Sequence, residues 1–541
     1  MSIQSMIDAA SPGSTVNVPP GTYNEQLLIN KPLTLQGPPA GGGTAIIDAG
    51  GLPSLPTILI LNEKVSVIGL TIQNGPLHGI QVGDESTIGL TDVNITNNHI
   101  SGHGNAGILT NYGAAMDIIS NVIENNGVGE GFNRVGIVLY PHGITNVFGN
   151  TVNNNMIDGI FARASATGLV IENNTVSNHS NSGITLAWDQ RNTIIFGNTI
   201  TDCGAGSFDE QGGIVIIQST AEIMQENVIR NCKPSGIFWG WVPTVGNPPN
   251  EILIDNNKIE NSTRDAIYLF SQGAGGFIPP DLFPLKPTIR NNTLVNSGRA
   301  GVYVSNSYYY GPGSADPTIN CNDIVENEWG VINGTAHIVD AVNNWWGDSS
   351  GPYNPQLNPG GAGNPVSDNV DFTPWLKVLS VIQIVGCSIK NVTLVDYKIR
   401  PPAGETIEVD LVIKIAGDVT VKTDEGTRVL NFETRFAKKL NMRVPNFCEA
   451  VPKIDYTAVC YAVQDSNAIQ AEIELCIVVN MVGQYCISIP SSYPCVPRNS
   501  MKFGLCRKTG TGDCINAEVV FDSCWFGKNL SHNVALPTQT C

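Results

Sequence analysis

The chain has 541 residues, of which 42% are hydrophobic and 14% are charged, and its formal net charge is -18. Through Leu376, 12 Lys/Arg against 31 Asp/Glu give -19, whereas from Lys377 onward 17 against 16 give +1, so the acidity belongs to the first part. An acidic surface repels phosphate backbones and anionic headgroups, and no apolar stretch approaches the roughly 20 residues that cross a bilayer. We therefore expect neither nucleic acid binding nor membrane insertion.

The first ten residues contain no Lys or Arg, and their apolar residues fall at Ile3, Met6, Ile7 and Ala10. This spacing predicts an amphipathic turn or two that ends at 11–13, suited to lie across the open end of a solenoid. The segment does not have the pattern of a secretory signal.

Two short sequence motifs recur from residue 79 to residue 331. One is a triplet that begins with Asn and has an aliphatic third residue, and the other is a Gly followed by an aliphatic residue. Where the spacing is tightest, Ile137 to Ile160 to Ile184, the period is 23 or 24 residues. A fixed period with short β-branched runs predicts a solenoid of stacked strands. We expect the aliphatic residues to stack inward, the Asn residues to form hydrogen-bonded ladders at the turns, and three tryptophans to seal the far end, namely Trp345, Trp346 and Trp375.

Both ends of this region resemble right-handed parallel β-helix proteins of the pectate-lyase and NosD-like class. The opening match is Val18-Pro19-Pro20-Gly21-Thr22-Tyr23 with Lys31-Pro32-Leu33-Thr34-Leu35-Gln36-Gly37, and the closing match is Asn343-Asn344-Trp345-Trp346-Gly347 with Asn369-Val370-Asp371-Phe372-Thr373-Pro374-Trp375-Leu376. The resemblance implies a parallel β-helix over residues 1–378 and leaves the activity open, because the class contains lyases, hydrolases, epimerases and non-enzymatic surface proteins.

The spacing between the Gly-aliphatic pairs grows after Ile237, Ile267 and Val302. The three insertions start at equivalent positions of successive coils, so we expect them to project from one edge of the solenoid and to form a binding or assembly face. Loops without a function are the alternative. The aromatic residues in and near them are the candidate binding residues: Trp188, Trp239, Trp241, Tyr308, Tyr309 and Tyr310.

Beyond the repeats, residues 379–490 contain period-two runs, which predict an antiparallel β-sandwich. The stretch 413–489, with Phe432-Glu433-Thr434-Arg435-Phe436 and Leu440-Asn441-Met442-Arg443-Val444-Pro445, resembles the SPOCS domain of clostridial and bacillar spore-coat assembly proteins. Residues 491–541 form a Cys- and Gly-rich tail, which we expect to pack on the sandwich or on a neighbouring subunit. The expected fold class is therefore all-β throughout.

Ten of the 13 cysteines lie in the last 155 residues, and none forms a CxxC pair, so disulfides are favoured over a zinc site. Cys203 and Cys232 follow equivalent triplets and should stack on adjacent coils about 4.8 Å apart, within disulfide range. The residues expected in disulfides are Cys203, Cys232, Cys448, Cys460, Cys476, Cys486, Cys495, Cys506, Cys514, Cys524 and Cys541. Disulfides imply an oxidising final location.

Reading successive coils in register places Tyr140, His142, Arg163 and Asp189 on one edge, with Trp188 beside them. A base, a cation and an aromatic platform are what a sugar-processing site needs. The segments Leu139-Tyr140-Pro141-His142-Gly143 and Asp158-Gly159-Ile160-Phe161-Ala162-Arg163 resemble the mannuronan C5-epimerase motif. In that family an Asp stands at the position of Tyr140, an acid at Gly143 and a second Asp at Arg163, so the resemblance implies a site without its catalytic acids.

The sequence thus favours a structural surface protein, a self-assembling spore-surface or extracellular appendage subunit that is stabilised by disulfides and binds glycans. A polysaccharide lyase, hydrolase or C5-epimerase is the alternative. We expect no cofactor; calcium among the Asp residues is the alternative, although these residues form no calcium-loop pattern. The expected partners are copies of the same chain and a polysaccharide, and the expected location is extracellular or on a spore surface without a classical signal peptide.

Overall fold

In the computed structural model the chain forms two compact units, residues 1–377 and 378–541. The structure describes residues 2–39, 41–87, 89–111, 115–130, 133–140, 145–163, 168–188, 193–219, 221–242, 251–273, 285–305, 315–377, 381–403, 406–423, 426–443, 447–465, 468–485, 515–519, 525–526 and 530–535.

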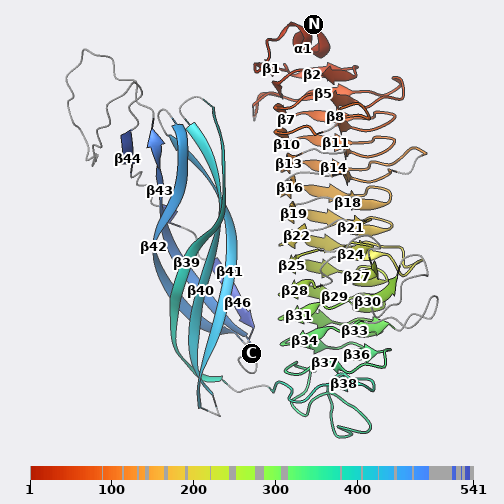
Figure 1. Cartoon of the computed structure of the whole chain (residues 1–541), viewed down its shortest axis with the longest axis vertical. Coiled ribbons are helices and arrows are strands. Elements are labelled where there is room, and N and C mark those ends of the chain that lie inside the picture. Colours follow the sequence, from red (N-terminus) through yellow and green to blue (C-terminus); the bar gives the residue numbers. More distant parts are fainter. Residues whose placement is uncertain are drawn as a thin grey trace. The chain divides into compact units, whose positions relative to one another are not determined.

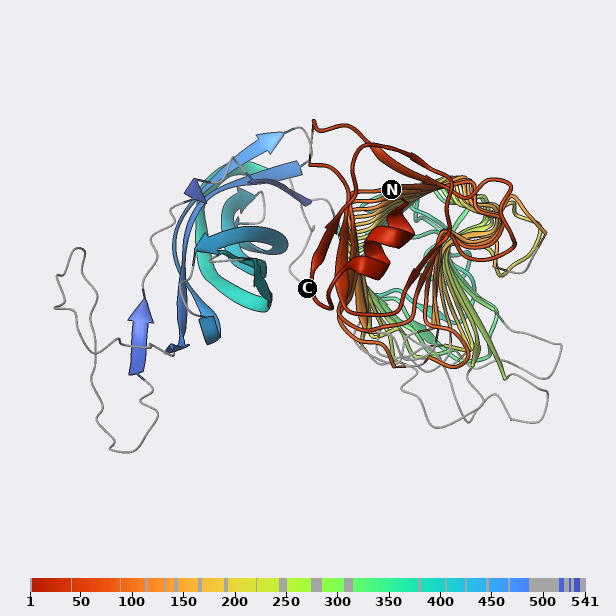
Figure 2. The same ribbon diagram turned by 90° about the horizontal axis from the view of Figure 1, so that it is seen from above.

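The first unit begins with helix α1 (Ile3–Ala9), which lies across the end of a coil of short strands (Figure 2). Ile3 and Ile7 point into the coil and are fully buried. The Ser2 hydroxyl caps the helix by accepting from the Ser5 N–H at 3.1 Å, and both Glu25 carboxylate oxygens accept N–H groups of the first turn, at 2.8 and 3.1 Å. These contacts satisfy donors that the helix itself leaves unpaired, and the carboxylate suits the positive end of the helix dipole.

The coil consists of three parallel sheets, called here A, B and C, which the chain visits in turn once per coil (Figure 1). Strands of each sheet pair with the strand one coil earlier and one coil later, in register, so equivalent residues form columns along the solenoid. This architecture confirms the predicted parallel β-helix. Burial alternates along most strands, because every second side chain of a strand points inward.

Sheet A consists of β1 (Thr15–Asn17), β4 (Leu33–Gln36), β7 (Val65–Ile68), β10 (Val93–Thr96), β13 (Met116–Ile119), β16 (Thr145–Phe148), β19 (Leu169–Glu172), β22 (Thr193–Phe196), β25 (Ile223–Gln225), β28 (Leu253–Asp255), β31 (Thr288–Arg290), β34 (Thr318–Asn320), β37 (Val339–Asp340) and β38 (Val370–Asp371). Sheet B consists of β2 (Gly21–Tyr23), β5 (Ala45–Asp48), β8 (Thr71–Gln73), β11 (His99–Ser101), β14 (Val122–Glu124), β17 (Thr151–Asn153), β20 (Thr175–Ser177), β23 (Thr199–Thr201), β26 (Val228–Arg230), β29 (Lys258–Glu260), β32 (Thr293–Val295) and β35 (Asp323–Val325). Sheet C consists of β3 (Leu27–Ile29), β6 (Ile58–Ile60), β9 (Ile80–Val82), β12 (Ile108–Thr110), β15 (Ile137–Leu139), β18 (Asp158–Arg163), β21 (Ser182–Ala187), β24 (Gly212–Ile217), β27 (Ser235–Val242), β30 (Asp265–Gly273), β33 (Ala300–Ser305) and β36 (Trp329–Asn333).

The asparagines of the repeated triplets form one buried ladder at the turn from sheet A to sheet B. From Asn121 onward each side-chain oxygen accepts hydrogen bonds from the backbone N–H and the side-chain amide of the Asn one coil earlier, as Asn198 Oδ1 does from Asn174 at 2.9 Å for both bonds. The amide of Asn198 also donates to Ile171 O at 2.9 Å. The members, in order, are Asn98, Asn121, Asn150, Asn174, Asn198, Asn227, Asn257, Asn292, Asn322 and Asn344. The ladder satisfies backbone groups that the turns would otherwise bury unpaired.

A second buried column follows sheet B, and the two cysteines that were expected to form a disulfide belong to it. Cys203 and Cys232 stack on adjacent coils, but both are free thiols and both are buried. The expected disulfide is therefore wrong. Residues stacked in a parallel sheet direct their Cα–Cβ bonds the same way, whereas a disulfide needs Cβ atoms that face each other.

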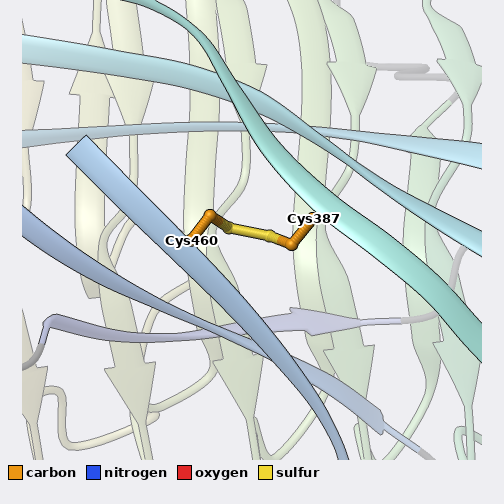
Figure 3. Close-up of a disulfide and its surroundings, with 2 residues drawn as sticks. All are labelled: Cys387 and Cys460. Atoms are coloured by element: carbon orange, nitrogen blue, oxygen red, sulfur yellow. A yellow bond between two sulfur atoms is a disulfide. The ribbon is translucent and has the colours of Figure 1, made fainter.

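The second unit contains long antiparallel strands in two sheets. One sheet consists of β39 (Val381–Ala403), β40 (Thr406–Thr423) and β41 (Gly426–Arg443); the other of β42 (Phe447–Asp465), β43 (Ala468–Tyr485), β44 (Ile515–Val519), β45 (Trp525–Phe526) and β46 (Leu530–Ala535). A disulfide between Cys387 of β39 and Cys460 of β42 joins the two sheets, with Cα atoms 5.4 Å apart (Figure 3). The all-β class and the antiparallel arrangement agree with the sequence prediction.

Candidate functional site

The outer face of sheet C carries most of the candidate residues. Ile160, Ile184 and Ile214 form an inward column and are fully buried. Trp239 belongs to the next inward column, beside Ile216, and is also fully buried, with Nε1 donating to Ser219 O at 3.2 Å. Its expected role as an exposed binding residue is therefore wrong: it lies two positions after Ile237 and so shares the core-facing side of the strand.

Tyr140, Arg163 and Trp188 do come together, from three successive coils of this face. The Arg163 guanidinium carbon lies 5.1 Å from the centre of the Tyr140 ring and 4.4 Å from that of Trp188. Within the described part of the chain, the buried Nε of Arg163 has no hydrogen-bond partner. The rings therefore hold the cation by their electron-rich faces. We call these three residues the arginine–aromatic cluster.

Trp188 is the exposed member of the cluster, with 48% of its surface accessible. It follows β21 directly, and its backbone N–H donates to Ile217 O at 3.1 Å. Its φ of 51° lies in the left-handed region, which costs a bulky residue of order 1–3 kcal/mol. The rings of Phe161 and Trp188 pack in a T-shaped arrangement, with centroids 5.8 Å apart. A large apolar ring is thus held in water on a strained backbone.

Several other expected site residues cannot be placed. His142, Asp189, Tyr308, Tyr309 and Tyr310 lie outside the described residues, and of Trp241 only the backbone, in β27, is described. The strands that precede the three insertions, β27, β30 and β33, are neighbours in sheet C. The insertions therefore start from one edge of one sheet, as the spacing predicts.

A second cluster, which the sequence did not reveal, lies at the start of strands farther along sheet C. Arg299 donates to both carboxylate oxygens of Asp265, from Nε at 2.8 Å, and stacks 3.8 Å from the ring centre of Tyr303. Burial raises the pKa of the fully buried Asp265 carboxyl, while the hydrogen bonds from Arg299 act in the opposite direction. Arg264 pairs with Asp209 and lies 5.8 Å from the Tyr268 ring centre. No motif signals this cluster, because Asp265 and Arg299 are 34 residues apart in sequence and only the coil register brings them together.

Asp158 is the buried carboxyl nearest in sequence to the arginine–aromatic cluster. Burial raises its pKa to about 6, although it accepts hydrogen bonds from Asn181 at 2.8 Å and Thr185 at 3.1 Å. Asp158 begins β18 and Arg163 ends it, so the two side chains stand at opposite ends of one strand. Asp158 is therefore better explained as a carboxyl that stabilises the turn than as a catalytic acid in contact with a ligand.

The described residues contain no cluster of three or more His, Cys, Asp or Glu side chains that could hold a metal ion. Likewise, none of the helices among them is long and apolar enough to span a bilayer.

These features define a protein of the right-handed parallel β-helix class. The family model described as "Right handed beta helix region" matches residues 56–208 and 158–247. None of the curated proteins compared with the chain matches it.

Several solved structures are similar to the chain at low sequence identity. The A-module of the mannuronan C-5 epimerase AlgE4 from Azotobacter vinelandii is 18% identical, covers 61% of this chain and 90% of its own, and has a TM-score of 0.47. The pectate lyase Pel9A is 16% identical, with 62% and 75% covered and a TM-score of 0.34. The Dettilon tailspike protein is 13% identical, with 87% and 84% covered and a TM-score of 0.35.

Proposed function

We propose that the chain is a surface protein that binds a polysaccharide at the arginine–aromatic cluster on the outer face of sheet C. The observation that carries the proposal is the exposed Trp188 ring on a left-handed backbone, stacked on Arg163. Exposed aromatic rings on strained backbone are maintained against a cost in stability, which is expected where the ring meets a ligand.

The chemistry of the cluster favours an acidic sugar. The face of an indole ring packs against the C–H groups of a pyranose, and a guanidinium group pairs with a carboxylate in a fixed fork. Arg163 is already flanked by Tyr140 and Trp188, so little freedom is lost when it binds an anion. The ligand class is therefore a uronic-acid polysaccharide.

Isothermal titration with oligouronates and with neutral glucan oligomers of equal length tests this proposal. We expect the wild-type chain to bind oligouronates and Trp188→Ala to bind them at least tenfold more weakly, which is about 1.4 kcal/mol. Tyr353→Ala removes an aromatic ring of similar exposure, 43%, from another part of the unit and should leave binding unchanged. Equal loss in both variants, or no binding by the wild type, would refute the site.

A polysaccharide-modifying enzyme is the alternative, and the placement of Tyr140 beside Arg163 favours it, since a phenol next to a cation is a candidate acid or base. Incubation with the same oligouronates, followed by detection of unsaturated or reducing-end products and of changed C5 configuration, distinguishes the two functions. A binding protein gives no product. Product that disappears in Tyr140→Phe or His142→Ala would establish the enzyme.

We further propose that copies of the chain assemble on a spore surface or another extracellular surface. The disulfide between Cys387 and Cys460 supports an oxidising location, and the SPOCS-like pattern of 413–489 supports the spore-coat setting. Electron microscopy of native material, together with electrophoresis with and without reductant, tests assembly. Isolated particles and a single monomer band under both conditions would count against it.

A further inference from the structure

The sheet of β39, β40 and β41 has two edges, and the edge formed by β41 is regular. β41 pairs with β40 residue by residue from Gly426 to Arg443, without a shift of register. Among the described strands it pairs with no other. In an antiparallel ladder every second residue directs its N–H and C=O away from the neighbouring strand. β41 therefore presents an unbroken row of backbone donors and acceptors along its 18 residues.

The opposite edge of the same sheet, formed by β39, is irregular. The pairing of β39 with β40 shifts its register at five places between Val381 and Ala403. Each such irregularity interrupts the ladder and changes the local twist of the strand. Interrupted edges discourage the addition of a further strand. One edge of the sheet is thus protected against strand addition, whereas the edge formed by β41 is suited to it.

The middle of β41 has a sequence that complements itself when a second copy runs in the opposite direction. It reads Phe432-Glu433-Thr434-Arg435-Phe436. In an antiparallel pairing that sets Thr434 opposite Thr434, Glu433 stands opposite Arg435 twice, and the two phenylalanines stand opposite one another twice. Opposite charges and aromatic pairs at directly opposite positions stabilise a sheet. A centre at Glu433 or at Arg435 would instead set two like charges opposite one another.

The same register continues both faces of the sheet. In the pairing with β40, Thr434 stands opposite Ile415, which is fully buried, so the even-numbered residues of β41 occupy positions on the buried face. Glu433 and Arg435 occupy positions on the other face, as does Val429, which is 43% exposed. Residues that meet in this register are both even or both odd. Positions on the buried face therefore meet positions on the buried face, and the charged positions meet on the other face.

We infer that two copies of the chain join edge to edge through β41, in an antiparallel pairing centred on Thr434, so that their two three-stranded sheets become one. Backbone hydrogen bonds along the edge give the affinity, and the opposite charges of Glu433 and Arg435 set the register. Both copies use the same surface, so the contact is isologous and closes as a dimer. The inference rests on the proposed self-assembly and names the surface that makes it.

Charge reversal in the full chain tests the inference, with association measured by sedimentation equilibrium. Glu433→Arg and Arg435→Glu each set like charges opposite one another twice, so we expect each variant to associate at least tenfold more weakly than the wild type. Their equimolar mixture restores both pairs of opposite charges and should associate like the wild type, and so should the double variant. Lys422→Glu, which reverses the charge of an exposed residue in β40, is the control and should leave association unchanged.

The outcomes separate the inference from the proposed self-assembly. If both single variants associate like the wild type, β41 is not the contact, and self-assembly stands on another surface. If the single variants are weakened but neither their mixture nor the double variant recovers, the pairing of these two positions is wrong. If the wild type is monomeric at every concentration, self-assembly fails and the inference fails with it. Thermal unfolding at the midpoint of the wild type verifies that the variants are folded.

Discussion

Arg299 binds both carboxylate oxygens of Asp265 from the next coil, and the Asp265 side chain is fully buried. Removal of a partner from a buried ion pair leaves an uncompensated charge, which costs far more than loss of an exposed pair. Asp265 begins β30 and Arg299 directly precedes β33, so the pair ties together two of the coils from which the long insertions leave.

We therefore expect Arg299→Met to lower the free energy of unfolding by about 3–5 kcal/mol at neutral pH. Because burial raises the pKa of Asp265, the loss should shrink at low pH, where the carboxyl is protonated in the folded variant. Chemical denaturation measures both effects. Arg230→Met, which breaks the partly exposed pair with Glu260, should cost less than about 1 kcal/mol. The double variant Arg299→Met with Asp265→Asn should recover most of the loss.

The buried ladder predicts a large effect of a small side-chain change. In Asn198→Ala the Asn174 N–H and the Ile171 carbonyl lose their partner and remain buried, so we expect a loss of at least about 3 kcal/mol. Asn178→Gly is the control: its side chain is exposed, it bonds only to Asn153 Oδ1 among the described residues, and glycine accepts its φ of 60°. Similar losses for both variants would show that the ladder is not what stabilises the coil.

Acid should weaken the coil through its buried histidines. Burial lowers the pKa of His103 to about 4, and likewise that of His78. Both values lie below 6.5, the pKa of an unfolded histidine, so the unfolded chain takes up these protons first as the pH falls. The stability that the neutral histidines contribute is therefore complete above pH 6.5 and is lost as the pH falls toward 4. The lowered pKa of His103 corresponds to a loss of folding stability on the order of 3 kcal/mol.

His103→Asn, which continues the column of Asn126, isolates this effect. As the pH falls from 7 to 4, the free energy of unfolding of His103→Asn should rise relative to that of the wild type by on the order of 3 kcal/mol. Asp158 and Asp323, with pKa values raised to about 6 by burial, act in the opposite direction but are present in both proteins and cancel. Parallel stability curves for the two proteins would contradict the prediction.

The two stacked thiols should be unreactive in the native protein. A hydrogen bond with Cys232, and then burial, raises the pKa of Cys203 well above 9. The thiolate of Cys203 is therefore absent at neutral pH, and Cys232 is buried away from the reagent. We expect the wild type to react with two more equivalents of a thiol reagent than Cys203→Ala with Cys232→Ala, but only after denaturation. A difference in the native state would mean that the coil opens at these residues.

The disulfide between the two sheets should stabilise the second unit. It joins residues 73 positions apart, and closing a loop of that length contributes about 4 kcal/mol in the chain-entropy model. Cys387→Ser should lower the unfolding midpoint of the second unit by an amount similar to that caused by reductant in the wild type. Reductant should then have little further effect on Cys387→Ser, whereas an equal further drop would mean that other disulfides dominate.

The coil could be predicted from the sequence because each of its columns repeats one residue type. Asn174, Asn198 and Asn227 are spaced by one coil, and their identity alone indicates a ladder. The same register predicts that Tyr140, Arg163 and Trp188 lie together, as they do, while His142 and Asp189 of the same predicted edge lie outside the described residues. Side chains that are brought together by the period of the coil alone can therefore be predicted from the sequence.

The direction in which a side chain points does not follow from the period of the coil alone. The position of Trp239 at the start of an insertion predicts a ligand-binding ring, although its separation of two residues from Ile237 indicates the core side of the strand. Cys203 and Cys232 are at the right separation for a disulfide, but their side chains point the same way. The pairing of Cys387 with Cys460 depends on how two sheets face each other, which no periodicity reports.

The ladder has a consequence for how such a chain changes over generations. Every asparagine in it before Asn344 accepts a hydrogen bond from the preceding coil and donates one to the following coil, so each of these coils presents the same two faces to its neighbours. Duplication or loss of a whole coil therefore leaves every remaining bond of the ladder intact and alters only the length of the ladder. A single-residue insertion within a coil breaks the ladder at that point. The length of this protein is thus free to drift in whole coils, while the outer columns keep their alignment.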